Sequence, residues 1–179
     1  MKKSDNKQSA QRFRGITLLE MLLYVSIVTG LLIMSGIVAM NVVFGKARIL
    51  AFEEVGENAR SSFHHVENGL NDAAAMTVPA LGEASSTISF RMSDPDLDPT
   101  VFRVEDGVLT MQQGAYGKVA ITSSAVRIAN VLFSNVSFAS SSAQTLRVEM
   151  TLSSGVINPR GNQKVTKTFY TTLYKDDSF

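Results

Sequence analysis

The chain begins, after a short polar segment, with one long stretch of mostly hydrophobic residues. From Ile16 to Phe44 nearly every position is apolar, and the one charged side chain in the run is Glu20. A helix of this length exceeds the ~30 Å hydrocarbon core of a bilayer. The pattern therefore predicts a membrane-inserting helix.

After residue 46 the run gives way to an amphipathic pattern. Apolar side chains recur at steps of three and four, while most charged side chains fall elsewhere around the helix. We predict that the helix starting at Ile16 continues to about Met76, packs its second half on a globular domain and is ended by Pro79 and Gly82. Gly56 and Gly69 are expected weak points, at about 1 kcal/mol each relative to Ala. The predicted buried face comprises Phe52, Val55, Ala59, Phe63, Val66, Leu70 and Ala73.

Beyond Ser85 the apolar positions alternate with a period of two, which is typical of half-buried strands. Asp106-Gly107 is a strong signal for a two-residue hairpin turn. The predicted strands cover about 88–92, 101–105, 108–112, 118–122, 126–138, 146–152 and 164–174. A long helix on an antiparallel sheet is an α+β fold. The expected organisation is a leader (1–15), a membrane helix (16–45), an amphipathic helix (46–77) and a β domain (78–179).

Charge is unevenly divided along the chain. The first 15 residues carry a net charge of +4, and the remainder carries −3. Clustered Lys and Arg beside a first apolar helix stay in the cytoplasm. We therefore expect a single-pass protein of the cytoplasmic (inner) membrane, with a cytoplasmic N-terminus and an exported C-terminal domain.

Common enzyme signatures are missing. The chain has no Cys, which excludes disulfides, thiolate zinc sites and a cysteine nucleophile. It also lacks GxSxG, HExxH and a phosphate-binding glycine loop. A non-enzymatic protein without a cofactor is expected.

Glu20 requires a functional explanation. A carboxylate within an apolar membrane helix costs about 2.5–3.5 kcal/mol on insertion scales. No Lys, Arg or His lies within helical reach on the apolar side. Its partner must come from outside this helix, or the carboxyl is neutral in the bilayer.

The run Arg12-Phe13-Arg14-Gly15-Ile16-Thr17-Leu18-Leu19-Glu20 resembles the class III signal sequence of type IV prepilins and type II secretion pseudopilins. The resemblance covers about the first quarter of the chain. It implies cleavage between Gly15 and Ile16 by prepilin peptidase and N-methylation of Ile16. It also implies pairing of Glu20 with the terminal amine of a neighbouring subunit, which would satisfy both charges in an apolar filament core.

This resemblance further implies a pilin-like fold, other pilin or pseudopilin subunits as partners, an inner-membrane assembly platform and a final place in an extracytoplasmic filament. Ser26 and Gly30 form a small-xxx-small pair that allows close helix approach. The expected helix interface is Leu18, Leu19, Leu22, Leu23, Val25, Ser26, Ile27, Gly30, Leu31 and Leu32. Two residues depart from the usual pattern, because Ile16 stands where Phe is common and Ile37 where many major pilins have Pro. Short segments around 88–91 and 126–133 resemble minor pseudopilins of the J class.

Other interpretations of the apolar run and of the exported domain lead to different functions. A secretory signal peptide would need a small-x-small cleavage site, and 37–39 is a poor one. A plain signal anchor would not need Glu20. A membrane-anchored exported binding domain that never assembles, or a subunit of a DNA-uptake pilus, is the alternative function.

Three further features of the sequence are candidate sites. Asp94, Asp96 and Asp98 have the spacing of a calcium loop, but Pro99 occupies the position that such a loop gives to Gly. His64 and His65 are adjacent on a helix and project about 100° apart, which disfavours a shared metal. The basic residues of the exported part are scattered without interleaved aromatics, so nucleic acid is not favoured as a partner.

Overall fold

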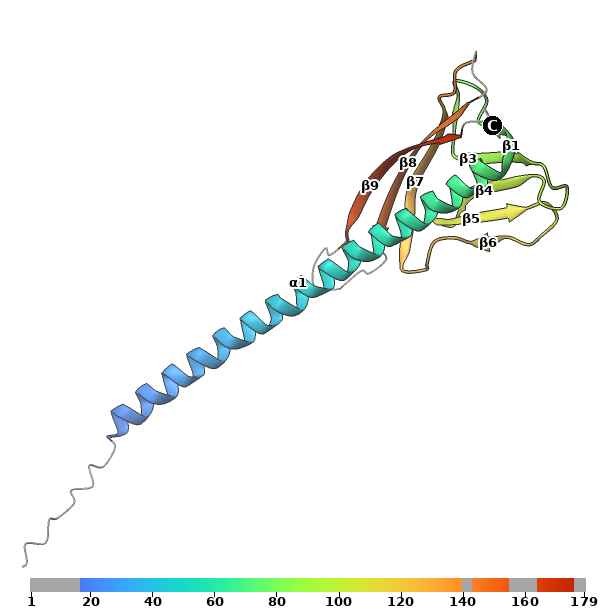
Figure 1. The fold of residues 1–179 in the computed structure, drawn as a ribbon. Coiled ribbons are helices and arrows are strands. Elements are labelled where there is room, and N and C mark those ends of the chain that lie inside the picture. The colour runs from blue at the N-terminus through green and yellow to red at the C-terminus, as the bar shows by residue number, and fades with distance from the viewer. Residues whose placement is uncertain (1–16, 140–142, 155–163, 176–179) are drawn as a thin grey trace, which may run out of the picture. The chain divides into compact units, whose positions relative to one another are not determined.

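The computed structural model describes residues 17–139, 143–154 and 164–175 (Figure 1). The chain divides into two compact units between Gly45 and Lys46. Helix α1 (Leu18–Asp72) runs without interruption through Gly30 and Gly36. The predicted first residue of this helix, Ile16, lies outside the described residues.

The second half of α1 buries the face that the periodicity predicts. Val55, Ala59, Val66 and Leu70 are almost inaccessible to solvent. Phe63 is partly buried against the same core. Phe52 differs from the prediction, because its side chain remains 49% exposed.

The helix ends earlier than predicted. It stops at Asp72 rather than near Met76, and residues Ala73–Val78 form strand β1. β1 pairs antiparallel with β3 (Thr87–Met92), with Met76 opposite Phe90. Backbone pairing with β3 therefore overrides the helical preference of the alanine-rich segment, which is a weak local bias. The amphipathic helix therefore ends at Asp72, and not at residue 77 as the sequence predicts.

The β domain contains two antiparallel sheets rather than the single predicted sheet. The first has the order β1-β3-β4-β5-β6, with β4 at Thr100–Glu105, β5 at Val108–Gln113 and β6 at Val119–Ala120. The second has the order β2-β7-β8-β9, with β2 at Ala84–Ser85, β7 at Val126–Asn135, β8 at Gln144–Ser154 and β9 at Thr166–Lys175. Figure 1 shows both sheets beside the second half of α1. The α+β class is confirmed.

Strand positions agree with the alternation where the strands are long. The hairpin between β4 and β5 turns at Asp106 and Gly107, whose φ angles are 52° and 81°. Positive φ at both central residues is the geometry that an Asp-Gly turn supplies. β6 is shorter than predicted, β7 ends at Asn135 instead of Phe138, and the short strand β2 was not predicted.

Gly69 has a packing role that the sequence did not indicate. It is buried on α1, and a Cβ atom there would lie 3.0 Å from Cε2 of Phe102 and 3.2 Å from Cε2 of Phe90. These two rings meet edge to face, with centroids 6.2 Å apart. The position lets the helix backbone approach the first sheet closely, so Gly69 is a contact point rather than a weak point.

Candidate functional site

The first unit presents an exposed apolar helix surface. Every residue from Leu18 to Val43 is exposed, including large side chains such as Leu18 at 82%. This part of α1 is long and apolar enough to cross a membrane. Exposed apolar surfaces of this size are typical of contact sites for lipid or for other proteins.

Glu20 lies in the first turn of this helix. The hydroxyl oxygen of Thr17 accepts a hydrogen bond from the Glu20 backbone N–H at 3.3 Å, and the Thr17 carbonyl accepts one from Met21 N–H at 3.1 Å. Thr17 is therefore the N-cap and Glu20 occupies the third helical position. The Thr-x-x-Glu pattern at 17–20 was a readable capping signal that the sequence interpretation overlooked.

The Glu20 carboxylate has no ion pair among the described residues. Gly15 and Ile16, the predicted cleavage site, lie outside the described residues. In the sequence, Glu20 follows the predicted new N-terminus, Ile16, by four residues.

Five of the predicted interface residues share one stripe of α1. Leu19, Leu22, Leu23 and Ser26, with Ile27, line a shallow hollow on the helix surface. The Ser26 hydroxyl donates to the Leu22 carbonyl at 2.8 Å, so it needs no partner from another chain. A Cβ atom at Gly30 would meet nothing within 4 Å. The stripe is thus open, and its contact with another helix stays a prediction.

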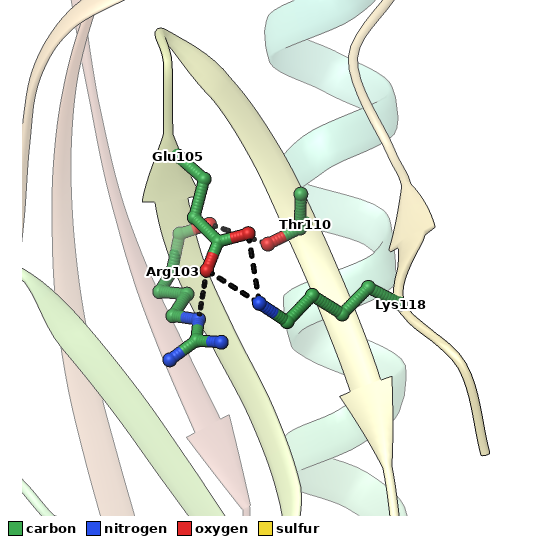
Figure 2. Close-up of polar contacts among 4 residues, drawn as sticks. All are labelled: Arg103, Glu105, Thr110 and Lys118. Atoms are coloured by element: carbon green, nitrogen blue, oxygen red, sulfur yellow. Dashed lines mark hydrogen bonds and ion pairs between the residues drawn. The ribbon is translucent and has the colours of Figure 1, made fainter.

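Glu105 is at the centre of a charged cluster on the first sheet, as Figure 2 shows. Its Oε1 lies 2.7 Å from Nε of Arg103 and 2.8 Å from Nζ of Lys118, and its Oε2 accepts from the same Nζ at 3.1 Å. Thr110 donates to the Arg103 carbonyl at 3.1 Å. The cluster therefore connects Lys118, which directly precedes β6, to Glu105 at the end of β4.

The Lys118 ammonium, hydrogen-bonded to Glu105, holds the pKa of that carboxyl below its usual 4.5. Partial removal of solvent raises this pKa, and the positive charge of Arg103 lowers it. A lowered pKa in the folded state means that the stabilisation is complete above pH 4.5 and disappears as the pH falls through the folded value.

We expect Glu105→Gln to lower the unfolding temperature at pH 7 and to change it little at pH 3. Thermal melts at both pH values test this, and equal effects at the two would contradict it. The difference should be small and weaker in high salt, because all three side chains are partly exposed.

The acidic turn after β3 does not gather its carboxylates. Asp94 Oδ1 accepts from the Asp96 backbone N–H at 3.0 Å, and Asp98 Oδ1 accepts from Met92 N–H at 2.9 Å. Each of these two carboxylates thus caps local backbone. Nowhere in the described ranges do three His, Asp or Glu side chains form a metal-binding group.

His64 and His65 differ in exposure. His64 is exposed, with Nδ1 3.9 Å from Oε2 of Glu67 and Nε2 3.4 Å from Nδ2 of Asn68. His65 is partly buried on the neighbouring face of α1. Both histidines therefore sit in a helix surface region rather than facing one another.

Several basic residues of the β domain make contacts within the domain. Arg127 donates to the Asp106 carbonyl at 2.9 Å, and Lys175 donates to the Ala73 carbonyl. Arg103 and Lys118 hold Glu105, as described above. Their positive charges serve turn and strand contacts, and Arg160 lies outside the described residues.

An open groove runs between α1 and β9. It has a volume of about 970 Å³, and sequence analysis did not foresee it because it depends on how the helix lies on the sheet. Lys167 closes part of it, with Nζ 4.7 Å from the ring centroid of Phe52 and 5.0 Å from that of Phe169. The lining residues are Glu53, Gly56, Glu57, Ala59, Arg60, Ser61, Phe63, His64, Glu67, Lys167, Phe169, Thr171, Thr172 and Leu173.

Comparisons of the chain with protein-family models, curated proteins and solved structures gave no match. The fold and the surfaces described above are therefore the basis for a functional proposal.

Proposed function

We propose that this chain is a structural subunit, of the minor kind, of a type IV pilus-like or type II secretion pseudopilus filament. Prepilin peptidase removes the basic leader after Gly15, and the subunit assembles through the first half of α1. It has no catalytic role and needs no cofactor.

The observation that carries this proposal is an exposed apolar helix with one carboxylate in its first turn. Lipid alone would cover the apolar side chains, but it offers Glu20 no compensating charge. A terminal amine at Ile16 of a neighbouring subunit would supply that charge, and a matched buried pair is tolerated where a lone charge is not. The stripe around Ser26 supports close packing of helices in the filament core.

Before assembly the subunit resides in the inner membrane, with its basic leader in the cytoplasm and its β domain exported. The orientation follows from the five basic residues before Ile16. Its partners are then the bilayer, the peptidase, an inner-membrane assembly platform and neighbouring subunits.

Intact mass and N-terminal sequencing test the processing step. The protein is recovered from membranes of cells with and without a prepilin peptidase. A chain beginning at Ile16, heavier by one methyl group, is expected only when the peptidase is present. A chain that keeps Met1, or that begins after Ala39 in both strains, would overturn the filament assignment.

A further inference from the structure

Two basic residues follow the apolar run on the side that we predict to be exported. Lys46 and Arg48 come two and four residues after Phe44, and both are exposed on α1. Neither forms an ion pair with any residue in the described ranges. Lys and Arg close to a membrane helix are normally concentrated on the cytoplasmic side. Two cations at this place therefore point to an anion at the exported surface of the membrane.

The segment 46–52 combines this charge with exposed apolar side chains. Ile49, Leu50 and Phe52 are 60%, 54% and 49% exposed. Residues 21–52 contain no Asp or Glu, so the segment carries a charge of +2 without a carboxylate of its own. Basic residues interleaved with exposed apolar ones are typical of a membrane interface, where apolar side chains enter the acyl layer and the cationic groups reach the phosphates.

Strand β9 runs beside the second half of α1 and in the same direction. Near its start, Lys167 Nζ lies 4.7 Å from the centroid of the Phe52 ring. At its end, Lys175 donates to the Ala73 carbonyl. The residues that precede β9 therefore continue from Phe52 in the direction of the segment 46–52.

Lys164 extends this strand and adds a third cation. The backbone N–H of Ser154 donates to the Val165 carbonyl at 2.8 Å, which continues the pairing of β8 with β9 beyond Thr166. Lys164 itself is exposed and has no ion pair within the part of the chain that the structure describes. Residues 164–175 contain no Asp or Glu. The β domain thus contributes a positive charge on the same side as Lys46.

The carboxylates of α1 lie farther from the apolar run than its cations do. The first of them, Glu53, comes five residues after Arg48, which is about 7.5 Å along the helix axis. Farther along, Glu57 Oε1 lies 3.5 Å from Nη1 of Arg60. A negatively charged surface attracts the cations and repels the carboxylates. The order of charges along α1 therefore fits an anionic membrane surface at the level of residues 46–48.

A second copy in the same bilayer does not supply the anion. Two copies have the same basic leader and the same apolar run, so their helices lie at the same depth and Lys46 of one meets Lys46 of the other. Contact with Glu53 of the other copy would require a shift of seven residues, about 10 Å along the helix axis. That shift would move the apolar run out of the hydrocarbon core by the same distance. The phosphate of an anionic lipid lies at the required depth without any shift.

We propose that residues 46–52 of α1, together with Lys164, form a docking site for the phosphate groups of anionic phospholipids in the leaflet on the exported side. The contact holds the β domain on the membrane surface before the subunit leaves the bilayer. This inference rests on the membrane insertion proposed above and does not depend on filament assembly.

Acetylation of lysine amines in the full chain tests the site residue by residue. Nanodiscs of phosphatidylcholine are compared with nanodiscs that also contain phosphatidylglycerol. Lys46 and Lys164 should react about fivefold more slowly beside phosphatidylglycerol. High salt should remove most of this difference. Lys175 is the internal control, because it lies beside Ala73 at the far end of α1 and should react equally in both nanodiscs.

Three results would overturn the site. Equal rates in the two nanodiscs would show that no anionic lipid is bound. Slower reaction of Lys46 alone would remove the β domain from the contact. Protection that follows protein concentration instead of phosphatidylglycerol would mean that a second copy covers the segment. Failure of the chain to insert into either nanodisc would overturn the membrane placement itself, which the filament role also requires.

Arg48→Gln tests the lipid preference with a matched control. Native mass spectrometry counts the lipids that the full chain keeps when it is released from nanodiscs with equal amounts of both lipids. Wild type should keep mainly phosphatidylglycerol, and Arg48→Gln should lower this preference about fivefold. Arg91→Gln removes an exposed charge on β3 opposite Ala75, near the far end of α1, and should leave the preference unchanged. Gln and Arg have similar helix propensity, so Arg48→Gln should melt like wild type. Equal preference in the two variants contradicts the proposal.

Discussion

Glu20→Ala is expected to remove this chain from filaments while leaving its insertion into the membrane intact. Insertion should be unaffected or easier, because alanine avoids the cost of about 2.5–3.5 kcal/mol for a carboxylate in an apolar helix. Assembly should suffer, because the Ile16 amine of the neighbouring subunit loses its partner. Breaking a buried pair costs about 3–5 kcal/mol, which corresponds to a loss of about 100-fold or more in incorporation. Quantification of the subunit in membranes and in sheared filaments measures both effects.

Thr17→Ala is the matched control for this experiment. It removes the hydrogen bond between the Thr17 hydroxyl and the Glu20 N–H, which caps α1, but it keeps the carboxylate. Loss of a cap costs about 1 kcal/mol. Incorporation of Thr17→Ala should therefore remain much closer to wild type. Equal losses in the two variants would mean that Glu20 acts only in helix capping, and normal assembly of Glu20→Ala would favour an anchored domain that does not assemble.

The fold was predictable from the sequence where periodicity is long and regular. Val55, Ala59, Val66 and Leu70 recur at helical steps, and all are buried. The Asp106-Gly107 turn was equally readable, because few residue pairs adopt positive φ at both positions. The end of α1 could not be predicted from the sequence. Ala73–Val78 suits a helix locally and becomes a strand only through pairing with β3. The division into two sheets likewise depends on contacts between distant strands.

The candidate site was predictable only in part. Glu20 is conspicuous in an apolar run, and Leu19 and Ser26 share a stripe by simple spacing. The role of Gly69 depends on where the rings of Phe90 and Phe102 lie, which no local pattern reports. The groove along β9 is similarly a product of tertiary packing. Local signals thus located the apolar helix and its carboxylate, whereas surfaces built from several elements required the structure.

Gly114 is the position where we expect the largest loss of domain stability from a single methyl group. Its φ is +48°, and its N–H donates to the Pro99 carbonyl at 3.0 Å. A Cβ atom there would lie 2.2 Å from the carbonyl oxygen of Asp96. Because that neighbour is backbone, relief requires displacement of the acidic turn, whose Asp98 carboxylate also caps Met92 N–H.

Gly114→Ala should therefore destabilise the β domain by about 2–5 kcal/mol, from backbone strain and overpacking together. At about 2–4 °C per kcal/mol for a chain of this size, the unfolding temperature should fall by roughly 5–15 °C. Gly117→Ala is the matched control, because a Cβ atom at Gly117 meets nothing within 4 Å. That variant should melt within a few degrees of wild type, since removing a glycine mainly restricts the unfolded chain. Thermal melts of the full chain in detergent measure both. If Gly114→Ala melted at the wild-type temperature, the turn at residues 94–99 would not lie against Gly114, and the packing that closes this end of the first sheet would be wrong.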